Sequence, residues 1–194
     1  MGVEVLTLYS FSTENWGRPE DEVQALMALL EEYLRDELEE LQTNRVRLRA
    51  IGELDRLPSS VRDGLGQVCE ITRSAPGLQL VLALSYGSRA EIVSAVRDIG
   101  RRVARGELDP EAITEATVSG ALYAADLPDP DLLIRTSGEL RLSNFLLWQI
   151  AYAELFVTEV AWPEFRGPHL DEAFSAYAAR QRRFGRTSAQ LEDP

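Results

Sequence analysis

The 194-residue sequence has little cysteine and histidine and no long apolar run. Cys69 is the only cysteine and His169 the only histidine, so an internal disulfide and a metal site built from Cys and His side chains are both excluded. A single cysteine suits a reducing compartment, and we expect a cytoplasmic protein. The uncharged stretch at residues 142–153 is well short of the ~18 residues that a membrane-spanning helix needs.

Basic residues are in the minority, with 20 Lys and Arg against 32 Asp and Glu and a formal net charge of -12. Because nucleic-acid binding draws much of its affinity from neutralised phosphates, this balance argues against a nucleic-acid partner. An anionic ligand must therefore bind in a local basic pocket.

Several short functional motifs are missing as well. The sequence contains neither GxxxxGK[ST] nor GxGxxG, so nucleotide binding by either glycine-rich loop is unsupported. It also lacks the GxSxG turn that carries the nucleophilic serine of many hydrolases. The function must be sought in other polar turns.

Apolar strands and amphipathic helices alternate along the chain. This alternation predicts an α/β fold, in which residues 1–194 form a single domain with a mostly parallel sheet flanked by helices. Residues 45–51 alternate strictly between polar and apolar, which is typical of a strand with one wetted side. The expected strands are residues 3–11, 45–51, 78–86, 131–134 and 155–160, and the longest expected helices are residues 20–44 and 169–185.

The polar turn after the expected strand 131–134 is the strongest candidate site. Arg135 and Arg141 lie in this turn, and Ser143 with Asn144 can cap a helix that we expect to begin at Phe145. Open α/β sheets bind ligands between strand and helix ends, so two permanent cations and a hydroxyl there suggest a phosphate or diphosphate. The alternative is that both arginines pair with acids, which we would favour for a lone arginine but not for this cluster.

Two further observations extend this hypothesis. The polar residues 12–18 follow the first expected strand, and a parallel sheet would place them at the same edge as Arg135. Glu154 stands at the end of the helix expected from Phe145, where a negative charge opposes the helix dipole. We therefore expect Glu154 to have a cationic partner.

Three long motifs resemble the bacterial cis-prenyltransferase (undecaprenyl diphosphate synthase) family. They are FSTENWGRP at Phe11–Pro19, YGSRAEI at Tyr86–Ile92, and PDPDLLIRTSGELRLSNFLLWQIAYAELFVTE at residues 128–159. The resemblance implies a Mg²⁺-dependent enzyme that condenses isopentenyl diphosphate with an allylic prenyl diphosphate. Its product would be a polyprenyl diphosphate of the undecaprenyl type, for the lipid carrier of cell-wall synthesis. The resemblance also implies a homodimer, with peripheral membrane contact through the product.

The same resemblance implies roles for individual residues. Arg135 would hold the diphosphate of isopentenyl diphosphate together with Arg141, Leu142 and Ser143, and it would also be a catalytic residue. Glu154 would bind Mg²⁺ and reach across a dimer. Because an amide is a poor base, Asn15 would orient the substrate while a diphosphate oxygen or water takes the proton. The residues that would line the condensation site are Ser12, Thr13, Glu14, Asn15, Trp16 and Arg18.

One segment of the family pattern is missing from this sequence. The family begins with a strand ending in an Asp-Gly-Asn-Gly-Arg loop, which supplies a metal-binding aspartate and holds the allylic diphosphate. The only Asp-Gly pair here, Asp63-Gly64, lies in an expected helix. We therefore interpret the sequence as amino-terminally truncated. Two alternatives stay open: a catalytically incomplete fragment or non-catalytic subunit of a hetero-oligomeric prenyltransferase, and a small α/β protein that binds diphosphates without turnover.

Overall fold

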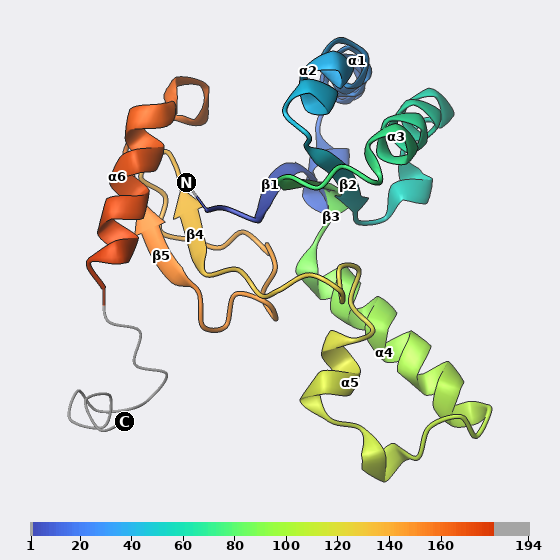
Figure 1. The fold of residues 1–194 in the computed structure, drawn as a ribbon. Coiled ribbons are helices and arrows are strands. Elements are labelled where there is room, and N and C mark those ends of the chain that lie inside the picture. The colour runs from blue at the N-terminus through green and yellow to red at the C-terminus, as the bar shows by residue number, and fades with distance from the viewer. Residues whose placement is uncertain (1, 181–194) are drawn as a thin grey trace. The chain divides into compact units, whose positions relative to one another are not determined.

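The structure, a computed structural model, describes residues 2–180 (Figure 1). Every strand pairing among these residues is parallel, and helices alternate with strands, which confirms the predicted α/β class. The strands form two sheets, of three and two strands. The chain divides into two compact units between Leu127 and Pro128, and one domain over residues 1–194 stays a prediction.

The first unit is built on a three-stranded sheet. Its strands are β1 (Val5–Ser12), β2 (Arg47–Ile51) and β3 (Gln79–Tyr86), in the order β1-β3-β2. Both outer strands start opposite Gln79, because Val5 and Arg47 each pair with it. The central strand is buried at every position after Gln79. In β2, Leu48 is buried between the half-buried Arg47 and Arg49, as expected for a strand with one wetted side, but the alternation ends at Ala50 and Ile51.

Three helices cover this sheet: α1 (Glu20–Asp36), α2 (Leu38–Thr43) and α3 (Ser59–Thr72). The single helix expected over residues 20–44 is interrupted at Glu37, whose ψ of -2° departs from the helical value. Leu34 and Leu65 pack in one core cluster with Leu48 of β2. Each fully buried leucine stabilises the fold by ~1.5–3 kcal/mol, so the apolar stripes of α1 and α3 determine how they dock.

Side-chain hydrogen bonds complete the attachment of α3, where they are buried, and of the last part of this unit, where they are exposed. Thr72 Oγ1 accepts a hydrogen bond from the Leu48 N–H at 3.0 Å and donates to the Val68 carbonyl at 2.9 Å. Arg49 donates two hydrogen bonds to the Asp126 carboxylate, at 2.6 and 2.8 Å. The remaining helices of this unit are α4 (Ser88–Ala104) and α5 (Glu115–Ser119), with short 3-10 helices at Thr13–Gly17, Leu54–Arg56 and Pro110–Ala112.

The second unit has a two-stranded sheet, β4 (Leu132–Arg135) and β5 (Glu154–Val157). Leu132 pairs with Glu154 and Arg135 with Val157. A 3-10 helix at Trp162–Glu164 and α6 (Gly167–Ala178) follow. Of the helix expected over residues 169–185, residues 181–185 lie outside the described residues.

The prediction of a helix that begins at Phe145 is wrong. Residues 143–152 form turns, in which Ser143, Asn144 and Leu146 have φ values of 51°, 61° and 45°. A left-handed residue costs ~1–2 kcal/mol and cannot continue a right-handed helix. Glu154 therefore begins a strand and does not end a helix.

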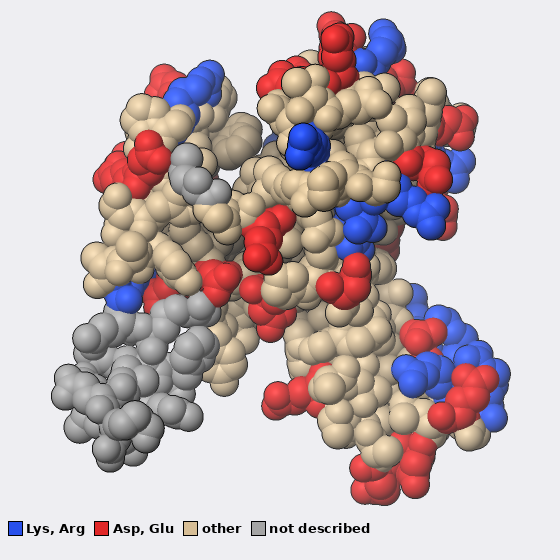
Figure 2. All heavy atoms as spheres, viewed as in Figure 1, with Lys and Arg blue, Asp and Glu red and all other residues tan. Residues whose placement is uncertain are grey.

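The surface carries charges of both signs. On the face drawn in Figure 2, acidic side chains are spread over all parts of the described chain, with arginines among them. No helix in residues 2–180 combines the length and apolar character needed to span a membrane.

Candidate functional site

The loop after β1 closes on itself through Asn15. The Ser12 N–H donates a hydrogen bond to Asn15 Oδ1 at 2.8 Å, across the first turn of the 3-10 helix Thr13–Gly17. Thr13 Oγ1 donates to the Glu14 carboxylate at 3.1 Å. Because the amide oxygen of Asn15 already accepts a backbone hydrogen bond, its NH₂ group is the part suited to contact a ligand.

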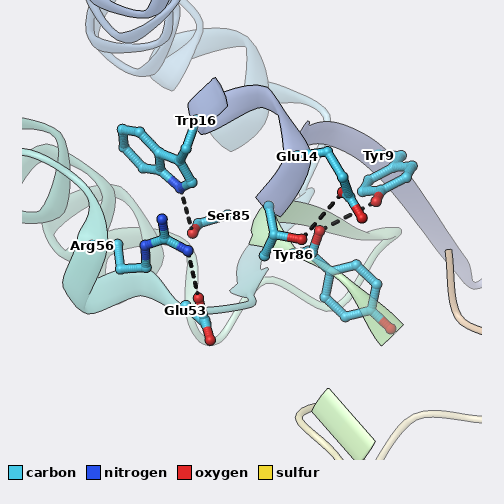
Figure 3. Close-up of polar contacts among 8 residues, drawn as sticks. Tyr9, Glu14, Trp16, Glu53, Arg56, Ser85 and Tyr86 are labelled. Atoms are coloured by element: carbon cyan, nitrogen blue, oxygen red, sulfur yellow. Dashed lines mark hydrogen bonds and ion pairs between the residues drawn. The ribbon is translucent and has the colours of Figure 1, made fainter. Parts of the chain in front are cut away.

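Trp16 is held from several sides (Figure 3). Its Nε1–H donates to the buried Ser85 Oγ at 2.9 Å, and its ring packs edge-on against Phe11 with centroids 4.9 Å apart. The Arg56 guanidinium lies 5.3 Å from the ring centroid and is itself bonded to Glu53 at 2.9 Å. These contacts fix the indole beside the end of β3.

Tyr9 lies near the same loop, with its side chain close to Glu14 (Figure 3). Its hydroxyl donates to the Tyr86 carbonyl oxygen at 3.2 Å. Burial, and secondly the negative charge of Glu14, raise the pKa of Tyr9 to about 12. The sequence interpretation did not include Tyr9, and no spacing in the sequence marks its contact with Tyr86, which lies 77 positions away.

The Tyr9 phenol should titrate about two pH units above an ordinary tyrosine, whose pKa is ~10. Because the folded pKa is the higher one, the associated stability is present in full below pH ~10 and is lost as pH rises towards 12. NMR titration of ring-labelled tyrosine, assigned with a Tyr9→Phe variant, measures this pKa. A Tyr9 pKa near 10 in the folded protein would contradict the expected burial.

Arg18 borders a cavity of about 490 Å³ in the first unit. Trp16, Val23, Met27 and Pro58 form its apolar wall. Arg18 is ion-paired with Glu22 at 2.6 Å, and both side chains are nearly half exposed. Exposed pairs of this kind contribute only ~0–1 kcal/mol, so the guanidinium is easily redirected to a stronger anion.

The two arginines in the turn that follows β4 share one acidic partner. Arg135 and Arg141 both form ion pairs with Glu139. The turn itself is tied to the end of β5, because the Ser137 N–H bonds the Val160 carbonyl at 2.9 Å and the Gly138 N–H bonds the Thr158 carbonyl at 2.8 Å.

The expected alternative, pairing of both arginines with acids, is thus what the structure shows for their terminal nitrogens. Glu139 was not among the candidates, although its position between two arginines was a signal. Arg135 Nε, however, is buried and has no hydrogen-bond acceptor within the described part of the chain. A buried donor that makes no hydrogen bond costs ~1–3 kcal/mol, so an additional acceptor at Arg135 Nε would be stabilising.

Glu154 has the cationic partner that we expected. Arg180 Nη1 contacts its Oε2 at 2.8 Å and also donates to the Leu155 carbonyl at 3.0 Å. Among residues 2–180, no group of three or more His, Cys, Asp or Glu side chains gathers into a metal site. A lone carboxylate nevertheless matches the way proteins hold Mg²⁺ jointly with substrate phosphates and water.

The predicted site residues fall into two groups, one in each unit. The first group lies at the carboxyl end of β1, and the residues from Arg135 to Ser143 lie at that of β4, where α/β proteins bind ligands. Glu154 is the exception, because it begins β5 and pairs with Leu132 at the opposite end of the two-stranded sheet. The residues of the first unit are Ser12, Thr13, Glu14, Asn15, Trp16 and Arg18; those of the second are Arg135, Arg141, Leu142, Ser143 and Glu154.

Parallel strands ending in arginine- and hydroxyl-bearing turns define an α/β protein suited to phosphate-bearing ligands. Residues 1–185 match the family described as "Putative undecaprenyl diphosphate synthase". The chain belongs to this family of prenyltransferases, which confirms the resemblance carried by its motifs.

Individual relatives agree with this assignment. The chain is 51% identical over 190 residues to an isoprenyl transferase of Porphyromonas gingivalis, covering 98% of this chain and 75% of that protein. It is 51% identical over 192 residues to a ditrans,polycis-undecaprenyl-diphosphate synthase ((2E,6E)-farnesyl-diphosphate specific) of Xanthomonas axonopodis pv. citri, covering 99% and 75%. A crystal structure of lavandulyl diphosphate synthase from Lavandula x intermedia with dimethylallyl diphosphate matches with a TM-score of 0.92 and 37% identity, over 95% of this chain and 80% of that one.

Proposed function

We propose that this protein is a cis-prenyltransferase that condenses isopentenyl diphosphate with an allylic prenyl diphosphate. The allylic carbon–oxygen bond breaks, a new carbon–carbon bond forms, and inorganic diphosphate and one proton are released. Repetition yields a polyprenyl diphosphate, of the undecaprenyl type used as a cell-wall lipid carrier. Family membership and the activities named for the relatives support this proposal. The single structural observation that carries it is the buried Arg135 Nε, which has no hydrogen-bond partner among residues 2–180.

The arginine turn would bind the diphosphate of isopentenyl diphosphate. Arg135 and Arg141 present planar guanidinium groups, which bond phosphate oxygens in pairs. Glu139 holds both groups when no anion is bound and would yield them to the more highly charged diphosphate. Ser143 and the backbone at Leu142 would add uncharged contacts.

The loop at Ser12–Arg18 would line the place of condensation. Asn15 would orient the substrate through its NH₂ group, because its Oδ1 is bonded to the Ser12 N–H. Because an amide is a poor base, proton removal would then fall to a diphosphate oxygen or water. The condensation site would also be lined by Thr13, Glu14 and Trp16. Arg18 would add positive charge to it.

Mg²⁺ would be the cofactor, with Glu154 as one carboxylate ligand beside the phosphate oxygens. A bound Mg²⁺ would stabilise the charge that develops on the departing diphosphate. For Glu154 to serve, its carboxylate must exchange Arg180 for the metal. The side chain is 27% exposed, so this exchange requires no rearrangement of the core.

The protein would act as a homodimer in the cytoplasm, with peripheral membrane contact through its lipid product. Symmetric dimers are the commonest assemblies of soluble proteins, and the family resemblance favours one here. Sedimentation velocity should show a species of twice the 21.7 kDa chain mass. A stable monomer at micromolar concentration would contradict this part of the proposal.

Incorporation of labelled isopentenyl diphosphate into extractable lipid tests the function. With an allylic diphosphate primer, we expect incorporation from a protein that includes the Asp-Gly-Asn-Gly-Arg loop, and this incorporation should require Mg²⁺ and stop when a chelator is added. Calorimetry with isopentenyl diphosphate, with and without Mg²⁺, is run in parallel. Binding of isopentenyl diphosphate without any incorporation would instead support a diphosphate-binding protein.

A further inference from the structure

Glu91 is a buried acid that the proposed reaction does not use. It lies in the first turn of α4 and is 1% exposed. Its Oε2 accepts a hydrogen bond from the Tyr86 hydroxyl at 2.5 Å, and its Oε1 accepts one from the Tyr123 N–H at 3.0 Å. Burying a carboxyl group is costly unless it is hydrogen-bonded, so these contacts commit Glu91 to one position.

Of the two residues that Glu91 holds, Tyr86 is the last residue of β3. Tyr86 is 0% exposed, and its ring packs edge-on against Tyr9 and Tyr123 with centroids 6.0 and 6.3 Å away. The preceding Ser85 is also 0% exposed and has a φ of 47°, which is strained for a residue with a side chain. Such a conformation persists only where its surroundings enforce it.

This strand end supplies the hydrogen-bond acceptors for Trp16, which lies in the loop Ser12–Arg18, and for Tyr9, which precedes that loop. Ser85 Oγ accepts from Trp16 Nε1 at 2.9 Å, and the Tyr86 carbonyl accepts from the Tyr9 hydroxyl at 3.2 Å (Figure 3). The two acceptors are adjacent in the chain, so a shift of Tyr86 moves both. The position of the loop therefore depends on how firmly the end of β3 is held.

We propose that Glu91 is a positioning residue for the loop Ser12–Arg18, because its carboxyl group anchors the strand end from which Trp16 and Tyr9 are hydrogen-bonded. The catalytic consequence of this assignment rests on the proposed function, since it takes the loop to be the place of condensation. The structural consequence, that Glu91 holds the strand end to which Trp16 and Tyr9 are hydrogen-bonded, does not depend on the proposed function. Glu91 lies on α4, which contributes no residue to the candidate site.

Three variants test this assignment. Glu91→Ala removes both anchoring bonds. Glu91→Gln keeps the shape and one acceptor oxygen. Thr72→Val is the matched control, because Thr72 is equally buried (2% exposed) and makes two hydrogen bonds that join α3 to β2, away from the loop. Urea denaturation first establishes that each variant folds and by how much it is destabilised.

In Glu91→Ala we expect the Tyr9 pKa to fall from about 12 towards its ordinary value, and the NMR signal of the Trp16 indole N–H to shift. For elongation we expect kcat to fall about tenfold to a hundredfold, as small misplacements of reacting groups do, with KM for isopentenyl diphosphate unchanged. Glu91→Gln should recover most of both properties, and Thr72→Val should match the wild type in both. If Glu91→Ala does not fold, a partial change in Glu91→Gln that Thr72→Val lacks supports the proposal.

Tyr9 and Trp16 signals that are unchanged in folded Glu91→Ala would overturn the assignment. If Glu91→Ala does not fold, signals in Glu91→Gln that are identical to those of the wild type would do the same. So would changes of equal size in Thr72→Val, because they would reflect lost stability in general. If the signals move as expected while even the wild-type protein shows no incorporation, the anchoring role stands and the proposed function fails.

Discussion

Replacing Arg135 by alanine should weaken binding of isopentenyl diphosphate by about 1.5–3 kcal/mol, the usual contribution of a hydrogen bond to a charged group. This corresponds to roughly a tenfold to hundredfold increase in the dissociation constant. The physical reason is twofold: the variant loses a permanent cation, and it loses the buried Nε donor that has no acceptor in the described chain. Calorimetric titration measures the change directly.

Two further variants sharpen this test. Arg135→Lys keeps the charge but removes the planar fork and Nε, so we expect it to lose most of the same affinity. Arg105→Ala removes an exposed arginine that is paired with Glu107 at 2.6 Å and serves as the matched control. An unchanged dissociation constant in Arg135→Ala, or full affinity in Arg135→Lys, would remove the Arg135 turn from the proposed binding site.

Gly52→Ala should destabilise the first unit by about 2–5 kcal/mol, which combines the cost of a left-handed residue with that of overpacking. Gly52 follows β2 with a φ of +123°, and a Cβ there would lie 2.0 Å from the Leu84 carbonyl oxygen. Leu84 belongs to the buried central strand, so its backbone cannot move aside. Urea denaturation gives the change in unfolding free energy.

Gly66→Ala is the control for this substitution. Gly66 lies in α3, and a Cβ there would meet no atom within 4 Å. Alanine is favoured over glycine inside a helix by about 0.5–1 kcal/mol, so this variant should be slightly more stable than the wild type. A Gly52→Ala protein as stable as the wild type would show that the backbone at Leu84 yields, contrary to its central position in the sheet.

The local pattern of the sequence determined the elements of the fold. A strand was expected at residues 78–86, and β3 (Gln79–Tyr86) is that strand. Alternation at residues 45–51 predicted a strand with one wetted side, and β2 (Arg47–Ile51) lies at the edge of the three-stranded sheet among the described residues. These predictions succeeded because the pattern of apolar and polar side chains that marks a helix or strand lies in residues that are close together in the chain. The arginine turn was visible for a similar reason, since its charged residues are close in the chain.

Tertiary structure decided what the local pattern does not contain. Trp16 and Ser85 are 69 positions apart, and Glu91 and Tyr123 are 32 apart, so no spacing in the sequence announces either hydrogen bond. The apolar residues after Ser143 suited a helix, yet left-handed backbone at Asn144 and Leu146 turned them into loops. Burial depends on how distant parts of the chain pack. Only folding buried Glu91 against the end of β3 and buried Arg135 Nε where the described residues offer it no acceptor.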